Sequence, residues 1–161
     1  MPTNLLRRSG DVQRPRQEGR GTRAGRRLAL VRAGKASLRI ELAATATADR
    51  IWAALPINST AQTWGQAVHF ETPVETGRER GARINVSPGD ICYWSEDNRV
   101  LIAFGATPIS GAAGIRLPAP CNVWAQALDD VAALASVRPG ERVSITVLAV
   151  EGEEGQARHG A

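Results

Sequence analysis

Short segments that alternate apolar and polar residues follow one another from residue 37 to residue 149, with turn residues between them. In Ser37–Ala43 every second residue is a leucine or an isoleucine. A period of two residues over this length is typical of a half-buried strand. The same pattern predicts strands at Ala67–Glu71, Cys121–Leu128 and Arg142–Leu148. Between turn residues, a short strand is predicted at Arg83–Val86, and the apolar runs Ile91–Trp94 and Arg99–Phe104 are predicted to form a hairpin with a polar connection.

Two short stretches have helical character. Ala48, Ile51, Trp52 and Leu55 are spaced three or four residues apart, which places them on one face of a helix. Thr47 is the expected N-cap, and Pro56 should end this helix because the residue before a proline is excluded from the helical region. A second helical turn is expected at Asp129–Leu134, capped by one of its aspartates.

The number and spacing of the strands indicate the fold class. With Ile115–Pro120 counted as extended, the chain has seven or eight short strands punctuated by turns. Pro118 and Pro120 exclude that segment from a central strand, because proline has no N–H for a ladder. This pattern predicts a mainly β domain at residues 37–149, a closed barrel of about eight strands with one or two short helices.

Charge separates this domain from the residues before it. Residues 1–36 carry ten basic and two acidic residues, a net charge of +8, whereas residues 37–161 carry ten basic and fourteen acidic residues, a net charge of −4. We expect the Arg/Gly-rich segment 1–36 and the polar segment 150–161 to be disordered tails. The first is either a basic arm with weak affinity for nucleic acid or a solvated extension of a protein that begins nearer Val31. The acidic domain itself is not expected to bind nucleic acid.

Several classes of chemistry have little support in the sequence. Cys92 and Cys121 lie in apolar segments and are interpreted as reduced core residues. His69 is one of two histidines and is interpreted as a half-buried strand residue. Ser110 lacks a nucleophile motif, and phosphate-binding and dinucleotide-binding glycine motifs are absent from the sequence. We therefore expect no metal, no cofactor, no membrane span and a cytoplasmic location.

Four motifs in order resemble a known family. They are Ala54–Ile57 followed by Ala61–Gly65, then Pro88–Trp94, then Phe104–Ser110, and finally Asn122–Trp124. Together they resemble small bacterial and archaeal proteins with a cyclophilin-like barrel, a likeness that runs from Leu38 to Val147. The resemblance implies a closed barrel capped by a helix, in a family whose function is unsettled.

The resemblance does not extend to the catalytic residues of the true prolyl isomerases. Those enzymes carry an arginine after a Phe-His pair, whereas here Glu71 follows His69 and Phe70. Relative to the small family, Ala106 stands where a proline is expected and Cys92 occupies a variable position of its motif. Without that arginine, a cation that could polarise a prolyl amide is not evident.

The aromatic and polar residues of these motifs form the predicted binding surface. A concave apolar patch with a few polar groups is the usual form of a small-molecule or peptide site. The alternative is that the aromatic residues only fill the barrel and the loop only turns the chain. The predicted contacts are Trp64, Tyr93, Trp94, Phe104, Thr107, Ser110 and Asn122.

Two functions follow from these observations. The first is a non-catalytic binding module that holds a small ligand or an extended peptide. The second is a peptidyl-prolyl cis-trans isomerase with an unusual active site.

Overall fold

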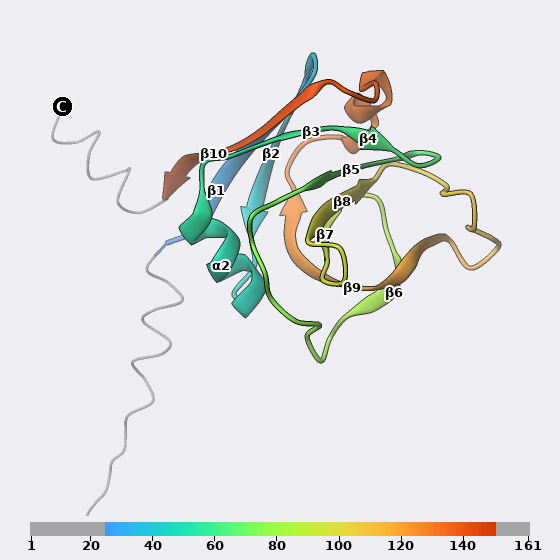
Figure 1. Ribbon diagram of the computed structural model, residues 1–161, viewed down its shortest axis with the longest axis horizontal. Coiled ribbons are helices and arrows are strands. Elements are labelled where there is room, and N and C mark those ends of the chain that lie inside the picture. Colours follow the sequence, from blue (N-terminus) through green and yellow to red (C-terminus); the bar gives the residue numbers. More distant parts are fainter. Residues whose placement is uncertain (1–24, 151–161) are drawn as a thin grey trace, which may run out of the picture. The chain divides into compact units, whose positions relative to one another are not determined.

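A computed structural model describes residues 25–150, with side chains up to residue 148, and Arg27–Ala149 form one compact unit (Figure 1). The described chain contains ten strands and two short helices. In chain order they are β1 (Arg27–Ala33), β2 (Ala36–Leu42), α2 (Ala46–Ala54), β3 (Ile57–Thr60), β4 (Gln62–Thr63), β5 (Ala67–Glu71), β6 (Arg83–Val86), β7 (Asp90–Trp94), β8 (Arg99–Ala103), β9 (Ile115–Ala127), the 3₁₀-helix η2 (Val131–Ser136) and β10 (Arg142–Val150).

Nine of these strands form a nearly closed barrel. The order in the sheet is β3-β10-β1-β2-β9-β7-β8-β5-β4, and β6 pairs with β9 outside this path. The two ends of the path, β3 and β4, are separated in sequence by Ala61 alone. One chain segment therefore contributes both ends of the sheet, which brings them together. This confirms the mainly β barrel predicted from the sequence.

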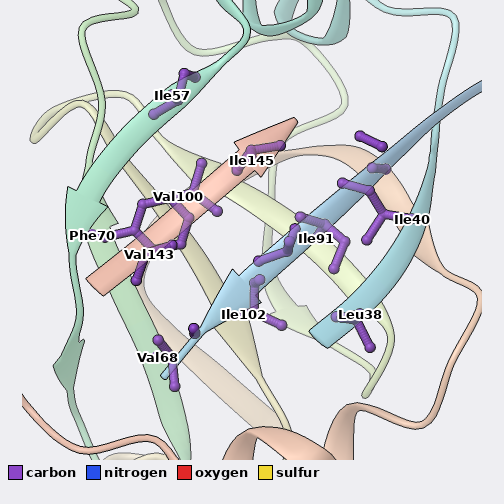
Figure 2. Packing of buried hydrophobic residues seen from close by; sticks show 14 of the residues in the cluster. Leu38, Ile40, Ile57, Val68, Phe70, Ile91, Val100, Ile102, Val143 and Ile145 are labelled. Carbon is purple, nitrogen blue, oxygen red and sulfur yellow. The ribbon is translucent and has the colours of Figure 1, made fainter. Parts of the chain in front are cut away.

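The core lies inside the barrel. Every second residue of the strands points inward, as the alternating pattern requires, and side chains from β2, β3, β5, β7, β8 and β10 meet there (Figure 2). A second buried cluster lies on the opposite face of β5, β7 and β8 and includes Cys92, Leu101, Leu117 and Cys121. This second cluster is covered by β6 and the first half of β9. As a result β5, β7 and β8 have buried residues on both of their faces.

The basic segment predicted to be a tail up to Ala36 ends earlier. Arg27–Ala33 form β1, which pairs with β2 and lies between β2 and β10 in the sheet. Its alternate residues Ala29, Val31 and Ala33 are buried in the core, while Arg32 points outward. The arginines are thus compatible with a strand because they occupy its outer face. Residues 1–24 and 151–161 lie outside the described part of the chain.

The prolines of β9 were expected to exclude residues 115–120 from a central strand, but the structure shows that they do not interrupt it. Ile115–Ala127 is one strand of 13 residues, whose first part pairs with β6 and whose second part pairs with β7 and β2. Pro118 and Pro120 lie between the paired positions, where the register with β6 shifts. A proline is tolerated at such an irregularity because no ladder N–H is required there.

The helix α2 begins at a different cap from the predicted one. The hydroxyl of Thr45 accepts the N–H of Ala48 at 3.1 Å, so Thr45 is the N-cap, and Thr47 is buried and bonded elsewhere. Pro56 follows the helix as predicted. The second helix, η2, has Asp130 as its N-cap, also as predicted. Among residues 25–150, neither helix has the length and apolar character needed to span a membrane.

Candidate functional site

The structure distributes the seven predicted contact residues over several places. Tyr93 and Trp94 are neighbours in β7, so their side chains face opposite ways. Tyr93 is buried in the barrel core, and its hydroxyl donates to the carbonyl of Val74 at 2.5 Å. Trp94 packs instead against the second cluster. They therefore cannot line one surface together.

Asn122 is part of a buried polar network. Its side-chain N–H groups donate to the hydroxyl of Thr47 and to the carbonyl of Gly77, both at 2.9 Å. Its side-chain oxygen accepts the N–H of Glu79 at 2.8 Å. The carboxylate of Glu79 in turn accepts the hydroxyl and the N–H of Thr47, at the start of α2. Asn122 thus fastens the chain at residues 77–79 to α2.

The remaining predicted residues lie near the loop after β8. Trp64 belongs to the turn between β4 and β5, and this turn packs closely against the loop. The approach is so close that a Cβ atom added to Gly65 would lie 2.7 Å from the side chain of Pro108. Gly65 has a φ of +60°, so both the close approach and the conformation require glycine. Phe104, in the same region, is partly buried against the core.

Within that loop, Thr107 and Ser110 hydrogen-bond to each other. The Ser110 hydroxyl accepts the N–H of Thr107 at 2.9 Å and that of Arg116 at 3.0 Å. Ser110 also lines an open hollow of about 370 Å³ with Pro88, Gly105 and other small residues. The binding surface predicted here stays a prediction.

A different groove opens where the barrel is not closed by hydrogen bonds. Strand pairing between β4 and β5 ends at Gln62 and His69, and β3 pairs only with β10. Between β3 and the end of β5 lies an open groove of about 540 Å³, which we call the seam groove. It is lined by Asn58, Ser59, Thr60, Gln62, Glu71, Thr72, Pro73, Asp97, Asn98 and Arg99.

Backbone groups of β3 face this groove. Ala61 donates its N–H to the carbonyl of Glu141, on the β10 side, at 2.8 Å. Backbone groups alternate in direction along a strand, so those of Thr60 point away from β10. The opposite wall, at the end of β5, also has backbone groups that point into the groove. Thr72 donates its N–H to the carbonyl of Asn98, on the β8 side, at 2.9 Å, so the backbone groups of the neighbouring Glu71 point away from β8. The two strands present unpaired edges to each other.

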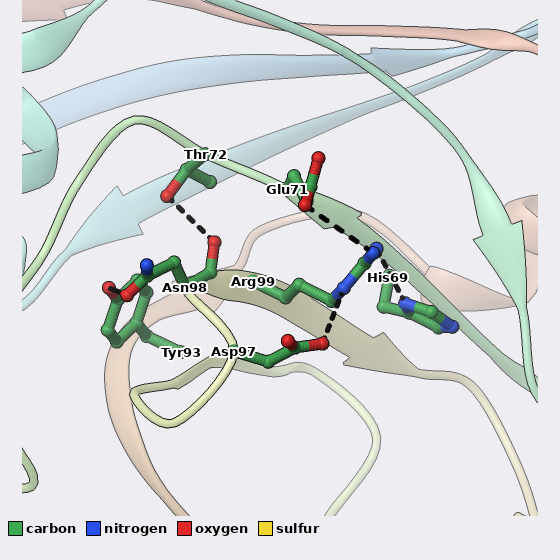
Figure 3. Close-up of polar contacts among 7 residues, drawn as sticks. All are labelled: His69, Glu71, Thr72, Tyr93, Asp97, Asn98 and Arg99. Carbon is green, nitrogen blue, oxygen red and sulfur yellow. Dashed lines mark hydrogen bonds and ion pairs between the residues drawn. The ribbon is translucent and has the colours of Figure 1, made fainter.

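Arg99 is held at the floor of the seam groove by three side chains (Figure 3). Its guanidinium lies 2.8 Å from the carboxylate of Asp97, 3.8 Å from that of Glu71, and 3.3 Å from Nδ1 of His69. Its side chain is only 20% exposed, whereas those of Glu71 and Asp97 are 73% and 50% exposed. The cation is therefore fixed in position while the two carboxylates remain accessible to solvent.

A family model described as Cyclophilin-like matches residues 26–146, well over half of the chain. The chain belongs to the cyclophilin-like family. The resemblance read from the sequence is thereby confirmed, and the family match, like the fold, begins before the predicted boundary at residue 37.

Two solved structures resemble this cyclophilin-like domain. The hypothetical protein AF2241 from Archaeoglobus fulgidus is 33% identical, with a TM-score of 0.67, over 78% of this chain and 96% of that one. The structure of McbB in complex with tryptophan is 12% identical, with a TM-score of 0.57, over 73% of this chain and 44% of that one. The second likeness concerns the fold alone. No curated protein matched the chain.

The structure shifts the pKa of three groups that could take part in chemistry, namely His69 and the two cysteines. Burial and the Arg99 cation lower the pKa of His69, which favours its neutral imidazole. Burial raises the pKa of both Cys92 and Cys121, the latter to about 12, which keeps these thiols protonated and unreactive. Among the described residues, no group of histidine, cysteine and acidic side chains could hold a metal ion.

Neither Arg99 nor the seam groove was predicted from the sequence. The strand that holds His69 contains no arginine, and Arg99 comes instead from β8, opposite Glu71 in the register with β5. The strand predicted at residues 67–71 is correct and the one predicted at 99–104 ends one residue earlier, at Ala103, yet nothing in the sequence paired the two strands. The pairing of β5 with β8 brings together His69 and Arg99, which are 30 positions apart in the sequence.

Proposed function

We propose that this cyclophilin-like domain is a non-catalytic binding module that holds an extended peptide segment in the seam groove. The observation that carries the proposal is the pair of unpaired strand edges, β3 on one wall and the end of β5 on the other. An extended chain binds such an edge by adding a strand, with main-chain hydrogen bonds for affinity and side-chain contacts for specificity.

The groove supports this mode of binding in two ways. Thr60 offers a backbone N–H and C=O that point toward the groove, and Asn58, two residues earlier, offers a second set in the same direction. The walls are also polar, because hydroxyl and amide side chains line β3 and the turn at Asn98. A peptide backbone has the donors and acceptors to match these groups, which an apolar small molecule lacks.

Side chains at the groove floor would select among peptides. Arg99 is fixed by Asp97, Glu71 and His69 and is positioned to donate a hydrogen bond to a carbonyl or carboxylate oxygen. The exposed carboxylates of Glu71 and Asp97 favour a basic side chain nearby. We therefore expect a bound segment to be extended and polar, with at least one lysine or arginine.

Replacing Thr60 by proline should weaken peptide binding at least tenfold, because it removes the groove-facing N–H that would pair with the ligand. A proline is tolerated at an edge position whose N–H faces outward, so the domain should remain folded. The probe is the tightest binder selected from a library of random ten-residue peptides against the full chain, titrated by calorimetry and by amide chemical shifts.

The matched control is Ile109→Ala, in the loop after β8, where the side chain is 46% exposed. It should leave the affinity unchanged, and the shifts should concentrate at Thr60, Glu71 and Arg99. A binder that shifts Gly105–Ser110 and responds to Ile109→Ala but not to Thr60→Pro would place the site at the loop and reject the seam groove.

One observation favours prolyl isomerisation as a second candidate function. Arg99 supplies the cation next to His69 that the sequence alone did not reveal. A fixed guanidinium at a peptide groove could polarise a prolyl amide. In a protease-coupled assay on an X-Pro peptide, this candidate predicts turnover above the uncatalysed rate, reduced at least tenfold by Arg99→Ala and unaffected by Arg116→Ala. A rate equal to the uncatalysed one in the unmodified chain would reject it.

A further inference from the structure

A second groove lies on the other side of β3, over β10 and β1. Its volume is about 550 Å³, and its lining residues are Arg32, Gly34, Asn58, Ser59, Thr60, Arg142, Val143 and Ser144. We call it the arginine groove. It shares Asn58, Ser59 and Thr60 with the seam groove, but its charge is different, because no acidic residue is among those that line it.

The two arginines come from different strands and point outward. Arg32 lies in β1 and Arg142 at the start of β10, and both are exposed on the outer face of the barrel. The turn after β1 is bound to β10 by a hydrogen bond from the N–H of Gly34 to the carbonyl of Arg142, at 3.0 Å. The backbones that carry the two side chains are therefore held in a fixed relation.

Neither guanidinium has an internal partner in the described chain. Arg27, Arg39, Arg78, Arg83 and Arg99 each pair with a carboxylate, whereas Arg32 and Arg142 pair with none among residues 25–148. The carboxylate of Glu141 lies against Gly34, yet it accepts the N–H of Arg138 and contacts neither of the two guanidinium groups as an ion pair.

Uncharged donors complete the groove. The side chains of Asn58, Thr60 and Ser144 line it, and within the described chain none of them makes a hydrogen bond to another residue. In the register of β3 with β10, Thr60 lies opposite Arg142 and Asn58 opposite Ser144, so these side chains share one face. Two guanidinium groups surrounded by unused hydroxyl and amide donors are suited to an oxyanion, which accepts several such bonds at once.

We propose that the arginine groove is a binding site for an oxyanionic group, either a carboxylate or a phosphate. The proposal does not depend on peptide binding in the seam groove. Since both grooves share β3, a ligand that occupies both would carry its acidic group on the β10 side of this strand.

The test is a titration of the full chain with sodium phosphate and, separately, with sodium succinate, followed by amide chemical shifts at constant ionic strength set with sodium chloride. We expect saturable shifts at Arg32, Gly34, Arg142 and Ser144, with a dissociation constant in the millimolar range. Tighter binding of phosphate would identify a phosphoryl group as the natural ligand chemistry, and tighter binding of succinate would identify a carboxylate.

Charge-neutral variants locate the site. Arg32→Gln and Arg142→Gln should each weaken binding of the preferred anion about tenfold, the usual effect of losing one charge-assisted contact. Arg116→Gln, which removes an exposed arginine from β9, is the matched control and should have no effect. Because the two substitutions lie in different strands, either one suffices if the other impairs folding. Shifts no larger than those produced by chloride, or an affinity in the Arg32→Gln and Arg142→Gln variants equal to that of the unmodified chain, would overturn the proposal.

Discussion

A chain that begins at Ala36 is expected not to fold, whereas a chain that begins at Gly25 should fold like the full protein. The first truncation removes β1, which lies between β2 and β10 and whose Ala29, Val31 and Ala33 are buried in the core. Burial of a single valine or leucine side chain contributes about 1.5–3 kcal/mol. The loss of the whole strand, with its ladder bonds on both sides, is therefore comparable with the total stability of about 5–15 kcal/mol that is typical of a domain.

Circular dichroism and amide chemical-shift dispersion would measure this difference. The chain from Gly25 should show a cooperative thermal transition, and the chain from Ala36 should show none. A cooperative transition in the shorter chain would contradict the placement of β1 within the barrel. The result also bears on the basic segment, because nucleic-acid binding by residues 1–24 can be tested only with a truncation that leaves β1 intact.

The strands that the sequence predicted correctly are those with a clear period of two. Ala67–Glu71 is an example, because Val68 and Phe70 face the core while Ala67 faces the second cluster on the other side of the strand. Period-two alternation depends only on which face of a strand is buried, and this is encoded locally. The hairpin of β7 and β8 was predicted on other grounds, from two short apolar runs and the polar turn between them, and both of its strands are buried on both faces.

The elements that the sequence did not predict depend on long-range pairing. In β1, apolar residues lie among arginines; the strand forms a local hairpin with β2, but its other neighbour in the sheet, β10, comes from the far end of the domain. The strands β3 and β4 are short and polar, with four and two residues, and their role is to close the barrel around Ala61. The seam groove exists because β3 and the end of β5 do not pair with each other. The sequence of either strand alone therefore contains no pattern that predicts the groove.

The candidate site shows the same division between local and long-range information. Tyr93 and Asn122 were selected as polar or aromatic residues in distinctive motifs, but the structure surrounds both with internal hydrogen-bond partners. Residues that stand out in a motif can do so because they organise the fold. The role of Arg99 instead arises from its position opposite Glu71, which only the strand register reveals.

Asn122→Ala is expected to lower the free energy of unfolding by about 3 kcal/mol. The substitution removes three hydrogen bonds from a side chain that is 1% exposed and leaves the N–H of Glu79 and the carbonyl of Gly77 without a partner. A buried polar group without a partner costs about 1–3 kcal/mol. Urea denaturation would measure the change. The control is Asn85→Ala, an exposed amide with one bond of 3.3 Å, which should change stability by less than about 0.5 kcal/mol.

Asn122→Asp distinguishes loss of hydrogen bonding from loss of packing, because it keeps the shape of the side chain. The new carboxyl group would be buried beside the carboxylate of Glu79, so its pKa in the folded state should rise above the unfolded value of about 4. The folded protein would then bind a proton that the unfolded chain has released. Stability would consequently fall as the pH rises from about 4 toward the raised value.

At pH 4 the protonated carboxyl group can still donate one hydrogen bond to Thr47 or Gly77, so the variant should be closest to the unmodified protein there. At pH 7 the carboxylate can only accept, and both former acceptors would face a negative charge. The gap in unfolding free energy between the variant and the unmodified chain should therefore widen over this range. A gap that is the same at both pH values would show that Asn122 acts through its volume, and the hydrogen bonds that fasten residues 77–79 to α2 would then contribute little to stability.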